Sequence, residues 1–252
     1  MDLSFAKAFD LSGRVALITG ASGGIGRVIA DLFAERGCRL VLIDRAEAVL
    51  EQAKALGSQH LAFVADVNDE AAAVRIVADV AAKAGRLDIL INNAGVARLD
   101  PAEAHTAELW DWTMGINLRA PFLWAREAGK QMIRQRYGRI VNMASQAAII
   151  ALDGHLAYCA SKAGLLGMTK VLALEWGPHG ITTNAILPTV VATDLGRKVW
   201  AGEVGEAFKQ KVPTRRFAEP VEIALAALYL ASDAAGMVNG TDLVVDGGFT
   251  IA

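Results

Sequence analysis

The alternation of short apolar runs with longer helical patterns constrains this chain more than any other feature. The apolar runs are rich in Val, Ile and Leu and lie at residues 15–19, 40–44, 61–65, 89–92, 140–144, 182–187 and 243–246. Helical patterns lie between them, near residues 24–36, 46–56, 69–85, 107–136, 157–177 and 220–231. This order is typical of βαβ units, in which helices cover a parallel sheet. We therefore expect residues 1–252 to form one α/β domain with a parallel sheet.

Composition limits the classes of function open to the chain. Of its 252 residues, 54% are hydrophobic and 21% are charged, which argues against disorder and suits a sheet with two covered faces. The formal net charge is −2 and no Lys- or Arg-rich tract is present, so a nucleic-acid partner is not expected. The loose cluster of Arg134, Arg136 and Arg139 is interpreted as a solvated helix end rather than a phosphate site.

Neither a metal nor a membrane partner is expected. Cys38 and Cys159 are the only cysteines, and neither has a metal-ligand spacing with any of the four histidines. The N-terminal segment from Met1 to Lys7 lacks a basic region followed by an apolar one, and no apolar run reaches the length of a membrane span. We therefore expect a cytoplasmic protein.

Tyr158 and Lys162 stand one helical turn apart, after Ser145 at the end of a predicted strand. Residues i and i+4 share a helix face, so the phenol and the ammonium can meet in one site. An ammonium beside a tyrosine favours the phenolate and lowers the pKa of the phenol, which then exchanges a proton with an alcohol or ketone. A Tyr-x-x-x-Lys spacing also occurs by chance on solvated helices, so this interpretation depends on the rest of the chain.

The glycine-rich segment from Thr19 to Gly26 follows the first predicted strand and opens the first helix. That position is the one a dinucleotide-binding turn requires, because glycines bring the backbone close to a pyrophosphate at a helix N-terminus. A plain glycine-rich turn is the alternative. The segment predicts cofactor contacts from Gly20, Ser22, Gly24, Ile25 and Gly26.

Asp44 ends the second predicted strand, eighteen positions after Gly26. A carboxylate at this spacing accepts hydrogen bonds from an adenosine ribose and repels a 2′-phosphate. Position 23 is glycine, so the loop offers no cation for that phosphate, although Arg45 would partly offset the repulsion and leaves some use of NADP open. NAD is therefore the expected cofactor. Asp66 with Val67 either meets the adenine or forms an ordinary turn.

Taken in order, these motifs together with Asn92-Asn93-Ala94-Gly95 and Asn117 span nearly the whole chain and resemble those of the short-chain dehydrogenase/reductase family. The resemblance implies a Rossmann-like, doubly wound sheet of about seven parallel strands. It implies that Tyr158 is the catalytic acid or base, Ser145 binds the substrate oxygen, Lys162 holds the nicotinamide ribose and Asn117 positions a water. Asn93, Ala94 and Gly95 would line the cofactor trough. A homotetramer is implied as well, with interfaces expected on the helices near 107–136 and 157–177 and at residues 249–252.

One departure from the family pattern narrows the resemblance. The family usually has Pro-Gly after the sixth strand, before the segment that contacts the nicotinamide, whereas here Pro188 is followed by Thr189. Pro188, Val191 and Thr193 are the expected contacts from this segment. The irregular stretch at residues 189–213 is expected to form an active-site lid.

Gln146, His155 and Trp200 look like those of the family branch with L-xylulose reductases and bacterial polyol dehydrogenases. In that branch the matching residues line a pocket for a small polyhydroxylated substrate. Mammalian L-xylulose reductases use NADPH, and Gly23 and Asp44 differ from them. His155 as a loop histidine, Gln146 bonded to local backbone and Trp200 packed on a neighbouring subunit remain alternatives.

Three functions are thus compared. The first is an NAD-dependent oxidoreductase that interconverts a secondary alcohol of a small polyol, sugar alcohol or vicinal diol with its ketone or ketose. The second is a 3-oxoacyl-thioester reductase, which normally prefers NADPH and is disfavoured by Asp44 and the polar pocket. The third, a non-catalytic NAD-binding regulator or scaffold, does not explain the presence of Ser145, Tyr158 and Lys162 together.

Overall fold

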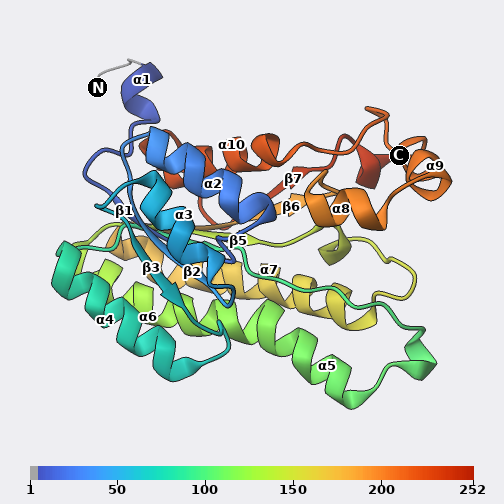
Figure 1. The fold of residues 1–252 in the computed structure, drawn as a ribbon, viewed down its shortest axis with the longest axis horizontal. Coiled ribbons are helices and arrows are strands. Elements are labelled where there is room, and N and C mark those ends of the chain that lie inside the picture. Colours follow the sequence, from blue (N-terminus) through green and yellow to red (C-terminus); the bar gives the residue numbers. More distant parts are fainter. Residues whose placement is uncertain (1–4) are drawn as a thin grey trace.

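Seven strands form one fully parallel sheet in the order β3-β2-β1-β4-β5-β6-β7 (Figure 1). The structure is a computed structural model that describes residues 5–252, so the first four residues of the N-terminal segment considered above lie outside it. The strands are β1 (Val15–Thr19), β2 (Arg39–Asp44), β3 (Leu61–Val64), β4 (Ile89–Asn92), β5 (Gly138–Met143), β6 (Ile181–Pro188) and β7 (Asp242–Val245). Strand order reverses between β1 and β4, and such a switch point opens a crevice at the carboxyl ends of the strands. The predicted Rossmann-like, doubly wound fold is confirmed.

Apart from the division of the pattern at 107–136, the helices follow the predicted patterns closely, with three additions. They are α1 (Phe5–Ala8), α2 (Gly24–Glu35), α3 (Ala48–Leu56), α4 (Glu70–Ala84), α5 (Ala107–Met114), α6 (Ala120–Gln135), α7 (Leu156–Trp176), α8 (Asp194–Val199), α9 (Glu203–Lys209) and α10 (Pro220–Ala231). Short 3₁₀ turns occur at η1 (Ala102–Ala104), η3 (Gln146–Ala148), η4 (Gly177–His179), η5 (Asp233–Ala235) and η6 (Phe249–Ile251). The additions are the short α1 and the two helices α8 and α9, which lie within the stretch expected to be irregular.

The single helix expected over residues 107–136 is wrong, because a π-helical turn, η2 (Gly115–Arg119), separates α5 from α6. Pro121 has no N–H, so it cannot donate the α-helical hydrogen bond to the carbonyl of Asn117 four residues earlier. The amide of Ala120 instead bonds the carbonyl of Gly115, five residues back. π turns of this kind are frequent at functional sites.

The central strands β1, β4, β5 and β6 are buried along their whole length, with side chains on both faces of the sheet, whereas the edge strands β3 and β7 are partly exposed. Ala16 and Ile18 of β1 pack in a core with α2, α3 and α10, which lie on the upper face in Figure 1. Val15 and Leu17 pack on the other face, in a core with α4 and α6. A smaller cluster joins α7 to β6 through Leu165. This two-sided burial is why the strands appear in the sequence as continuous apolar runs.

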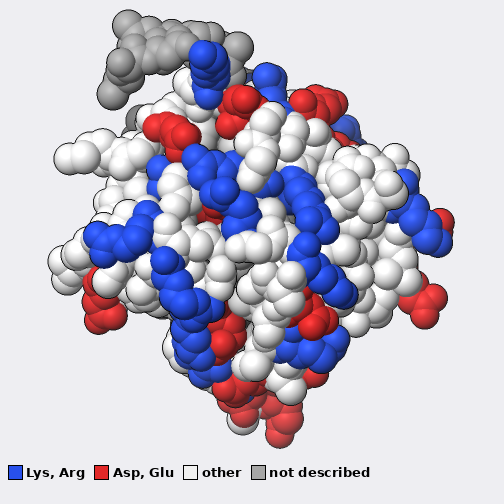
Figure 2. Space-filling view, turned by 90° about the vertical axis from the view of Figure 1, so that its left-hand side faces the viewer, with Lys and Arg blue, Asp and Glu red and all other residues white. Residues whose placement is uncertain are grey.

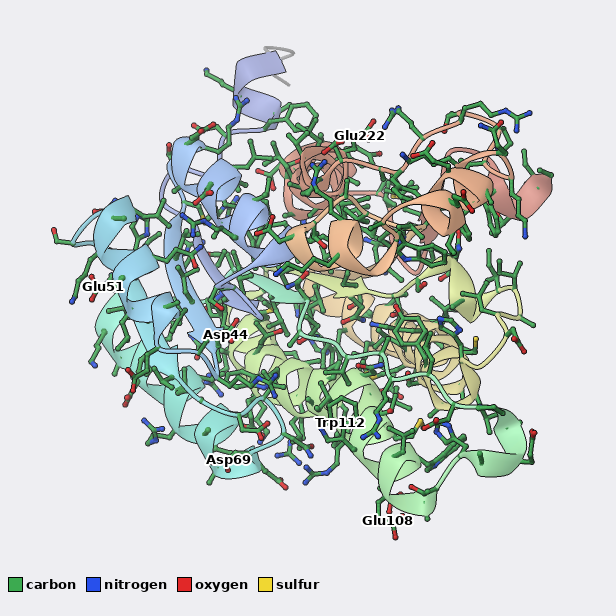
Figure 3. The ribbon with its side chains drawn as sticks, turned by 45° about the vertical axis from the view of Figure 1, so that its right-hand side comes forward. Asp44, Glu51, Asp69, Glu108, Trp112 and Glu222 are labelled. Atoms are coloured by element: carbon green, nitrogen blue, oxygen red, sulfur yellow. The ribbon has the colours of Figure 1, made fainter. Side chains whose placement is uncertain are left out.

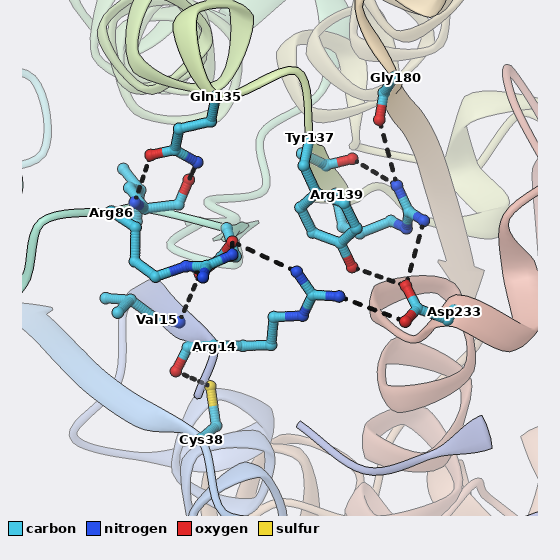
Figure 4. Close-up of polar contacts among 12 residues, drawn as sticks. Arg14, Val15, Cys38, Arg86, Gln135, Tyr137, Arg139, Gly180 and Asp233 are labelled. Atoms are coloured by element: carbon cyan, nitrogen blue, oxygen red, sulfur yellow. Dashed lines mark hydrogen bonds and ion pairs between the residues drawn. The ribbon is translucent and has the colours of Figure 1, made fainter. Parts of the chain in front are cut away.

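Asp88 lies at the amino edge of the sheet and is fully buried. Its carboxylate accepts hydrogen bonds from the amide of Val15 at 2.9 Å and from Arg86 at 2.7 and 2.6 Å, with Arg14 at 3.7 Å (Figure 4). A buried carboxylate is tolerated only when it is paired and hydrogen-bonded in this way. Asp88 therefore ties the starts of β1 and β4 together.

A second carboxylate extends this network toward β5. Asp233 of η5 accepts from the Tyr137 hydroxyl at 2.9 Å and pairs with Arg14 at 3.3 Å and Arg139 at 3.5 Å. The guanidinium carbon atoms of Arg14 and Arg139 lie 3.9 and 4.4 Å from the centre of the Tyr137 ring. Arg139 is thus a buried residue of β5, not part of the solvated helix end expected for it.

Figure 2 shows Lys and Arg side chains gathered on the face that holds this amino edge. Helix carboxyl ends point to the same face, and Arg36, Lys83, Arg134 and Arg136 stand in or just after the last turns of α2, α4 and α6. Cations are favoured there because helix carboxyl ends carry partial negative charge. The basic face is therefore explained by the fold.

We predict that Asp88→Ala lowers the free energy of unfolding by about 3 kcal/mol, because it leaves the Val15 amide and two arginines without their buried partner. Urea denaturation followed by circular dichroism measures this. Glu51→Ala is the control, since Glu51 pairs with Lys54 at the surface and its loss should cost less than about 0.5 kcal/mol. Equal losses in the two variants would contradict the role given to Asp88.

Candidate active site

The glycine loop between β1 and α2 lies at the switch point. Gly20 adopts a left-handed conformation at φ +65°, and a Cβ there would lie 2.9 Å from the Ala94 Cα atom. The N-cap of α2 is Gly23, which has no side chain to bond the first helical amides. Those amides are free to bind an anion, and the helix dipole favours one there. The loop is therefore built to receive a pyrophosphate.

Asp44 ends β2 beside this loop. Its carboxylate accepts hydrogen bonds from the Ser22 amide at 3.0 Å and the Ala46 amide at 3.1 Å, which fixes its orientation. Asp66 lies at the end of the next strand along and accepts from the Asn68 amide at 2.8 Å. Asp66 thus forms the local turn considered from the sequence while it also lines the cavity described below.

A reciprocal set of hydrogen bonds joins the ends of β1 and β4. The Thr19 hydroxyl accepts from the amides of Asn93 and Ala94 at 3.1 and 3.2 Å. The Asn93 side chain donates to the carbonyls of Thr19 and Gly20 at 3.1 and 3.0 Å. These bonds hold the glycine loop and the segment from Asn93 to Gly95 at a fixed separation. The role of Thr19 was not predicted from the sequence.

A cavity of about 710 Å³ opens between these segments. Among the predicted cofactor residues, those that line it are Gly20, Ser22, Gly24, Ile25, Asp44, Arg45, Asp66, Val67, Asn93, Ala94, Gly95 and Thr193. Lining residues that the sequence interpretation missed are Gly23, Ala65, Asn68, Val96, Trp112, Ile116 and Asp194. Figure 3 places Asp44 on the strand side of this region and Trp112 on α5. In the sequence, the i, i+4 spacing of Trp112 and Ile116, directly before Asn117, could have indicated that this segment lines the cavity.

Five predicted cofactor residues do not line this cavity: Gly26, Tyr158, Lys162, Pro188 and Val191. Gly26 serves close packing instead, because a Cβ there would lie 2.1 Å from the Gly20 carbonyl oxygen. Pro188 is buried at the end of β6, and Val191 forms an isolated bridge with Ala218. Direct contacts from these residues stay predictions.

The cavity fits a nicotinamide dinucleotide. Its uncapped helix N-terminus suits the pyrophosphate, and the Asp44 carboxylate at its edge suits ribose hydroxyls. Thr193 and Asp194, at the start of α8, close the other side, and the Thr193 methyl lies 3.5 Å from where a Cβ of Gly24 would stand. Within residues 5–252, no group of three or more His, Cys, Asp or Glu side chains could hold a metal ion.

Lys162 is buried in α7, with 4% of its surface exposed. Its ammonium donates to the Met143 carbonyl at 2.7 Å and lies 5.7 Å from the centre of the Tyr158 ring. A Cβ on Gly95 would lie 3.4 Å from the ammonium nitrogen, so the ammonium faces the trough segment. Burial lowers the pKa of Lys162 from 10.5 to about 8, because the charged form loses its hydration.

Tyr158 lies one turn before Lys162 on α7 and is half-buried. Burial raises the pKa of its phenol, while a hydrogen bond with Ser145 acts in the opposite direction. The expectation that Lys162 lowers this pKa is wrong for the chain without cofactor, because desolvation of the phenolate dominates. Ser145 follows β5 and is the N-cap of η3. Its hydroxyl accepts from the Ala147 amide at 3.2 Å, which fixes the orientation of the side chain.

Asn117 sits in the π turn and connects two parts of the site. Its amide oxygen accepts from the Val96 amide at 2.8 Å, and its nitrogen donates to the Val96 carbonyl at 2.9 Å and the Ser161 hydroxyl at 3.2 Å. Ser161 in turn donates to the Tyr158 carbonyl at 2.8 Å. Asn117 therefore fixes the segment after Gly95 against the helix that carries Tyr158.

Two buried polar atoms without partners belong to residues that follow the carboxyl ends of the neighbouring strands β5 and β6. Gln146 is 3% exposed, and its side-chain oxygen has no hydrogen-bond partner. The buried Thr189 hydroxyl, at the position where the family usually has glycine, also lacks one. The His155 ring lies edge-on to Tyr158 with centres 6.0 Å apart, and its Nδ1 is 2.6 Å from the Asp153 carbonyl. A carbonyl only accepts, so Nδ1 donates and Nε2 of the neutral ring is left as an acceptor.

The ring contacts of Trp200 are with other aromatic residues, and not with Tyr158 or His155. Within the described chain, its indole packs on Phe208 at 4.7 Å and Phe217 at 6.3 Å between ring centres, so Trp200 belongs to an aromatic cluster. Substrate contact by Trp200 stays a prediction. No helix in residues 5–252 is both long enough and apolar enough to cross a membrane.

Comparisons with known proteins agree with this geometry. Residues 20–250 match the family described as enoyl-(acyl carrier protein) reductase. The chain is 53% identical to D-threitol dehydrogenase from Mycolicibacterium smegmatis, over 99% of this chain and 98% of that one. It is 48% identical to an NAD-dependent glycerol dehydrogenase from Listeria innocua, over 98% of each chain.

A solved structure from Beutenbergia cavernae is similar throughout. It is described as an NAD(P)-dependent gluconate 5-dehydrogenase with NADP bound at low occupancy, and it superposes with a TM-score of 0.92 at 36% identity over 97% of this chain and all of the other. These matches and the assembled Ser145, Tyr158 and Lys162 lead to one conclusion. The chain belongs to the short-chain dehydrogenase/reductase family and is an oxidoreductase that acts on alcohols with a nicotinamide cofactor.

Proposed function

We propose that this chain is an NAD-dependent dehydrogenase that interconverts a secondary alcohol of a small polyol with the corresponding ketone. The observation that carries the substrate class is the unpaired side-chain oxygen of Gln146, buried directly after Ser145. Leaving such an atom unpaired is costly, whereas a hydroxyl of a bound polyol would satisfy it. The free Nε2 of His155 offers a second acceptor near Tyr158. The names of the threitol and glycerol dehydrogenases support the same class.

The chain's own residues would then manage one proton and the position of the alcohol. We assign Ser145 to hold the alcohol oxygen, and Tyr158 to take its proton during oxidation or return it during reduction. Lys162 and the segment from Asn93 to Gly95 would hold the nicotinamide ribose, and Asn117 a water. A bound nicotinamide supplies the hydride chemistry, so the protein needs to orient the carbinol carbon toward it. Burial raises the pKa of Tyr158, and the positive charge of an oxidised nicotinamide nearby would act in the opposite direction.

NAD is proposed over NADP on the position of Asp44. Its carboxylate lines the cavity and is held by the Ser22 amide, where it would accept from ribose hydroxyls and repel a 2′-phosphate. Arg45 also lines the cavity and would temper this preference. The related gluconate 5-dehydrogenase binds NADP, so the preference has to be measured for this chain.

The substrate class is tested with Gln146→Leu and His155→Leu. Each variant removes one proposed polar contact and puts an apolar side chain of moderate size in its place. We expect each to lower kcat/KM for threitol or glycerol by roughly ten-fold or more, the scale of one lost hydrogen bond. NADH formation should fall less with an apolar secondary alcohol. Tyr158→Phe sets the background rate and should abolish turnover of both substrates while NADH still binds.

Two outcomes would overturn the polyol assignment. One is an equal loss on polyol and apolar alcohol in both variants. The other is efficient reduction of 3-oxoacyl thioesters by the unmodified chain with no measurable oxidation of threitol, arabinitol, xylitol, sorbitol, glycerol or propanediol. The second would favour the thioester reductase, the activity closest to the description of the matched family.

For the cofactor, we predict that the unmodified chain has a higher kcat/KM with NAD than with NADP and that Asp44→Ala shrinks the ratio by roughly ten-fold or more. Asp44→Asn separates the two effects, because it keeps an acceptor for the Ser22 amide and removes the charge. Arg45→Ala should reduce any residual rate with NADP. A preference of the unmodified chain for NADP would refute the assignment.

We predict that the buried ammonium of Lys162 lowers the free energy of unfolding at neutral pH. Its folded pKa of about 8 lies below the ordinary 10.5, so below pH 8 both states are charged and folding bears the full desolvation penalty, about 3 kcal/mol. Between pH 8 and 10.5 the unfolded state binds more protons, and this penalty is relieved as pH rises. Lys162→Met should therefore raise the free energy of unfolding at pH 7, and the gain should shrink by pH 9.5. A gain that is absent, or that does not depend on pH, would contradict the burial argument.

A homotetramer is proposed on exposed apolar side chains of the helices singled out in the sequence. Leu174 of α7 is 78% exposed, and Val171 and Phe122 on α7 and α6 are exposed too. Light scattering should give four times the chain mass, and Leu174→Glu should lower it. Val74→Glu, which changes an exposed apolar residue of α4, should leave the mass unchanged. A monomer at micromolar concentration would exclude this assembly.

A further inference from the structure

The lid, residues 189–213, has few means of holding its own shape. Its helices α8 and α9 span six and seven residues, too short to be stable in isolation. Its first part is fixed at the cofactor cavity, where Thr193 caps α8 by accepting from the Gly196 amide at 3.0 Å. Its second part, α9, must be held by side-chain packing.

That packing centres on Phe208, near the end of α9. Its ring centre lies 4.7 Å from that of Trp200, 6.1 Å from that of Phe217 and 4.9 Å from that of Phe249. The Phe208 and Phe249 planes differ by 16°, so these two rings stack. Phe249 belongs to the last turn of the chain, η6, which is remote from the lid in sequence.

The end of the chain is itself firmly fastened. Asp246 directly follows β7 and is buried, and its carboxylate accepts from the amides of Gly248 and Thr250 and from the Thr250 hydroxyl, each at 2.8 Å. We call residues 246–251 the C-terminal hook. Gly247 and Gly248 turn the hook through left-handed conformations at φ +64° and +89°. The hook is thus held by hydrogen bonds to Asp246, directly after the edge strand β7.

The hook also meets the end of the lid. The Thr214 amide donates to the Gly247 carbonyl at 3.2 Å. A Cβ on Gly247 would lie 2.2 Å from the Thr214 hydroxyl, and one on Gly248 would lie 3.0 Å from the Pro213 ring. The hook therefore touches the lid at α9 and at the point where the lid ends.

We propose that the C-terminal hook is the latch of the lid and that Phe249 is a positioning residue for the alcohol substrate. Stacked on Phe208, Phe249 fixes α9 and, through Phe208, the Trp200 side of the lid, while Thr193 lies beside Gly24 at the cofactor cavity. A lid held at both ends presents one surface to the substrate. This inference rests on the proposed function only through the alcohol used in the assay.

The test compares three variants of the 252-residue chain, with NADH bound for the digestion and with NAD and the alcohol for the kinetics. Phe249→Ala removes the stacked ring, Phe249→Tyr keeps it, and Ile251→Ala changes a hook residue that is 89% exposed. Limited trypsin digestion reports on the lid through cleavage at Arg197, Lys198, Lys209 and Lys211. Steady-state kinetics reports on the substrate, and NADH titration on the cofactor.

Phe249→Ala is expected to speed lid cleavage and to raise KM for the alcohol, each by roughly ten-fold, the scale of a lost aromatic pair. The NADH dissociation constant should rise less than about three-fold, since the hook lies outside the cofactor cavity. Phe249→Tyr should restore both readouts, and Ile251→Ala should match the unmodified chain. A purely structural role for Phe249 would lower the thermal midpoint without this selective rise in KM.

Unchanged lid cleavage in Phe249→Ala would overturn the latch. Faster cleavage with an unchanged KM would overturn the positioning role. If the unmodified chain oxidises no polyol, the proposed substrate class fails by itself, and the latch is judged by lid cleavage and by KM for whichever secondary alcohol the chain does oxidise.

Discussion

The clamp between Thr19 and Asn93 is the interaction on which the rest of the site depends. It joins the ends of β1 and β4, the two strands between which the order of the sheet reverses. A switch point leaves the neighbouring loops free to diverge, and their separation must be set by side chains. Because Asn93 bonds the Thr19 and Gly20 carbonyls, the glycine loop and the trough segment form the two walls of one cavity. Asn117 continues the arrangement by fastening Val96 toward α7, which carries Tyr158 and Lys162.

Much of this arrangement could be predicted from the sequence because it follows from periodicity and from rigid local chemistry. Strands buried on both faces appear as apolar runs, and the glycine loop has an unmistakable place between a strand and a helix. The π turn was missed, although Pro121 stands four residues after Asn117 and marks the break. The contacts of Trp200 and the hook depend on tertiary packing between distant segments, which no local pattern encodes. The raised pKa of Tyr158 was missed for a related reason, because desolvation depends on the complete surroundings of a group.

Charged side chains are paired differently at the two edges of the sheet. At the amino edge, the carboxylates of Asp88 and Asp233 are surrounded by arginines and by hydrogen-bond donors, so each charge is compensated within the chain. At the carboxyl edge, the Lys162 ammonium bonds a single carbonyl, and the Gln146 oxygen bonds nothing. Buried polar atoms without partners also occur elsewhere in the described chain, for example at Gln52 and at the Nε of Arg139. The Gln146 oxygen is therefore connected with the proposed substrate site by its position directly after Ser145, and not by its lack of a partner alone.

Residues 189–213, proposed to form a lid, need an anchor outside themselves. The polar side chains of Gln146 and His155 offer little apolar surface for packing, so we propose that this segment is held by apolar contacts elsewhere. The aromatic cluster of Trp200, Phe208, Phe217 and Phe249 provides that apolar contact away from the reacting groups. The hook is itself held at the end of β7, because the Gly248 and Thr250 amides donate to Asp246. The aromatic contacts that hold residues 189–213 thus involve other residues than Gln146 and His155, so this segment can be anchored without an apolar partner among those polar side chains.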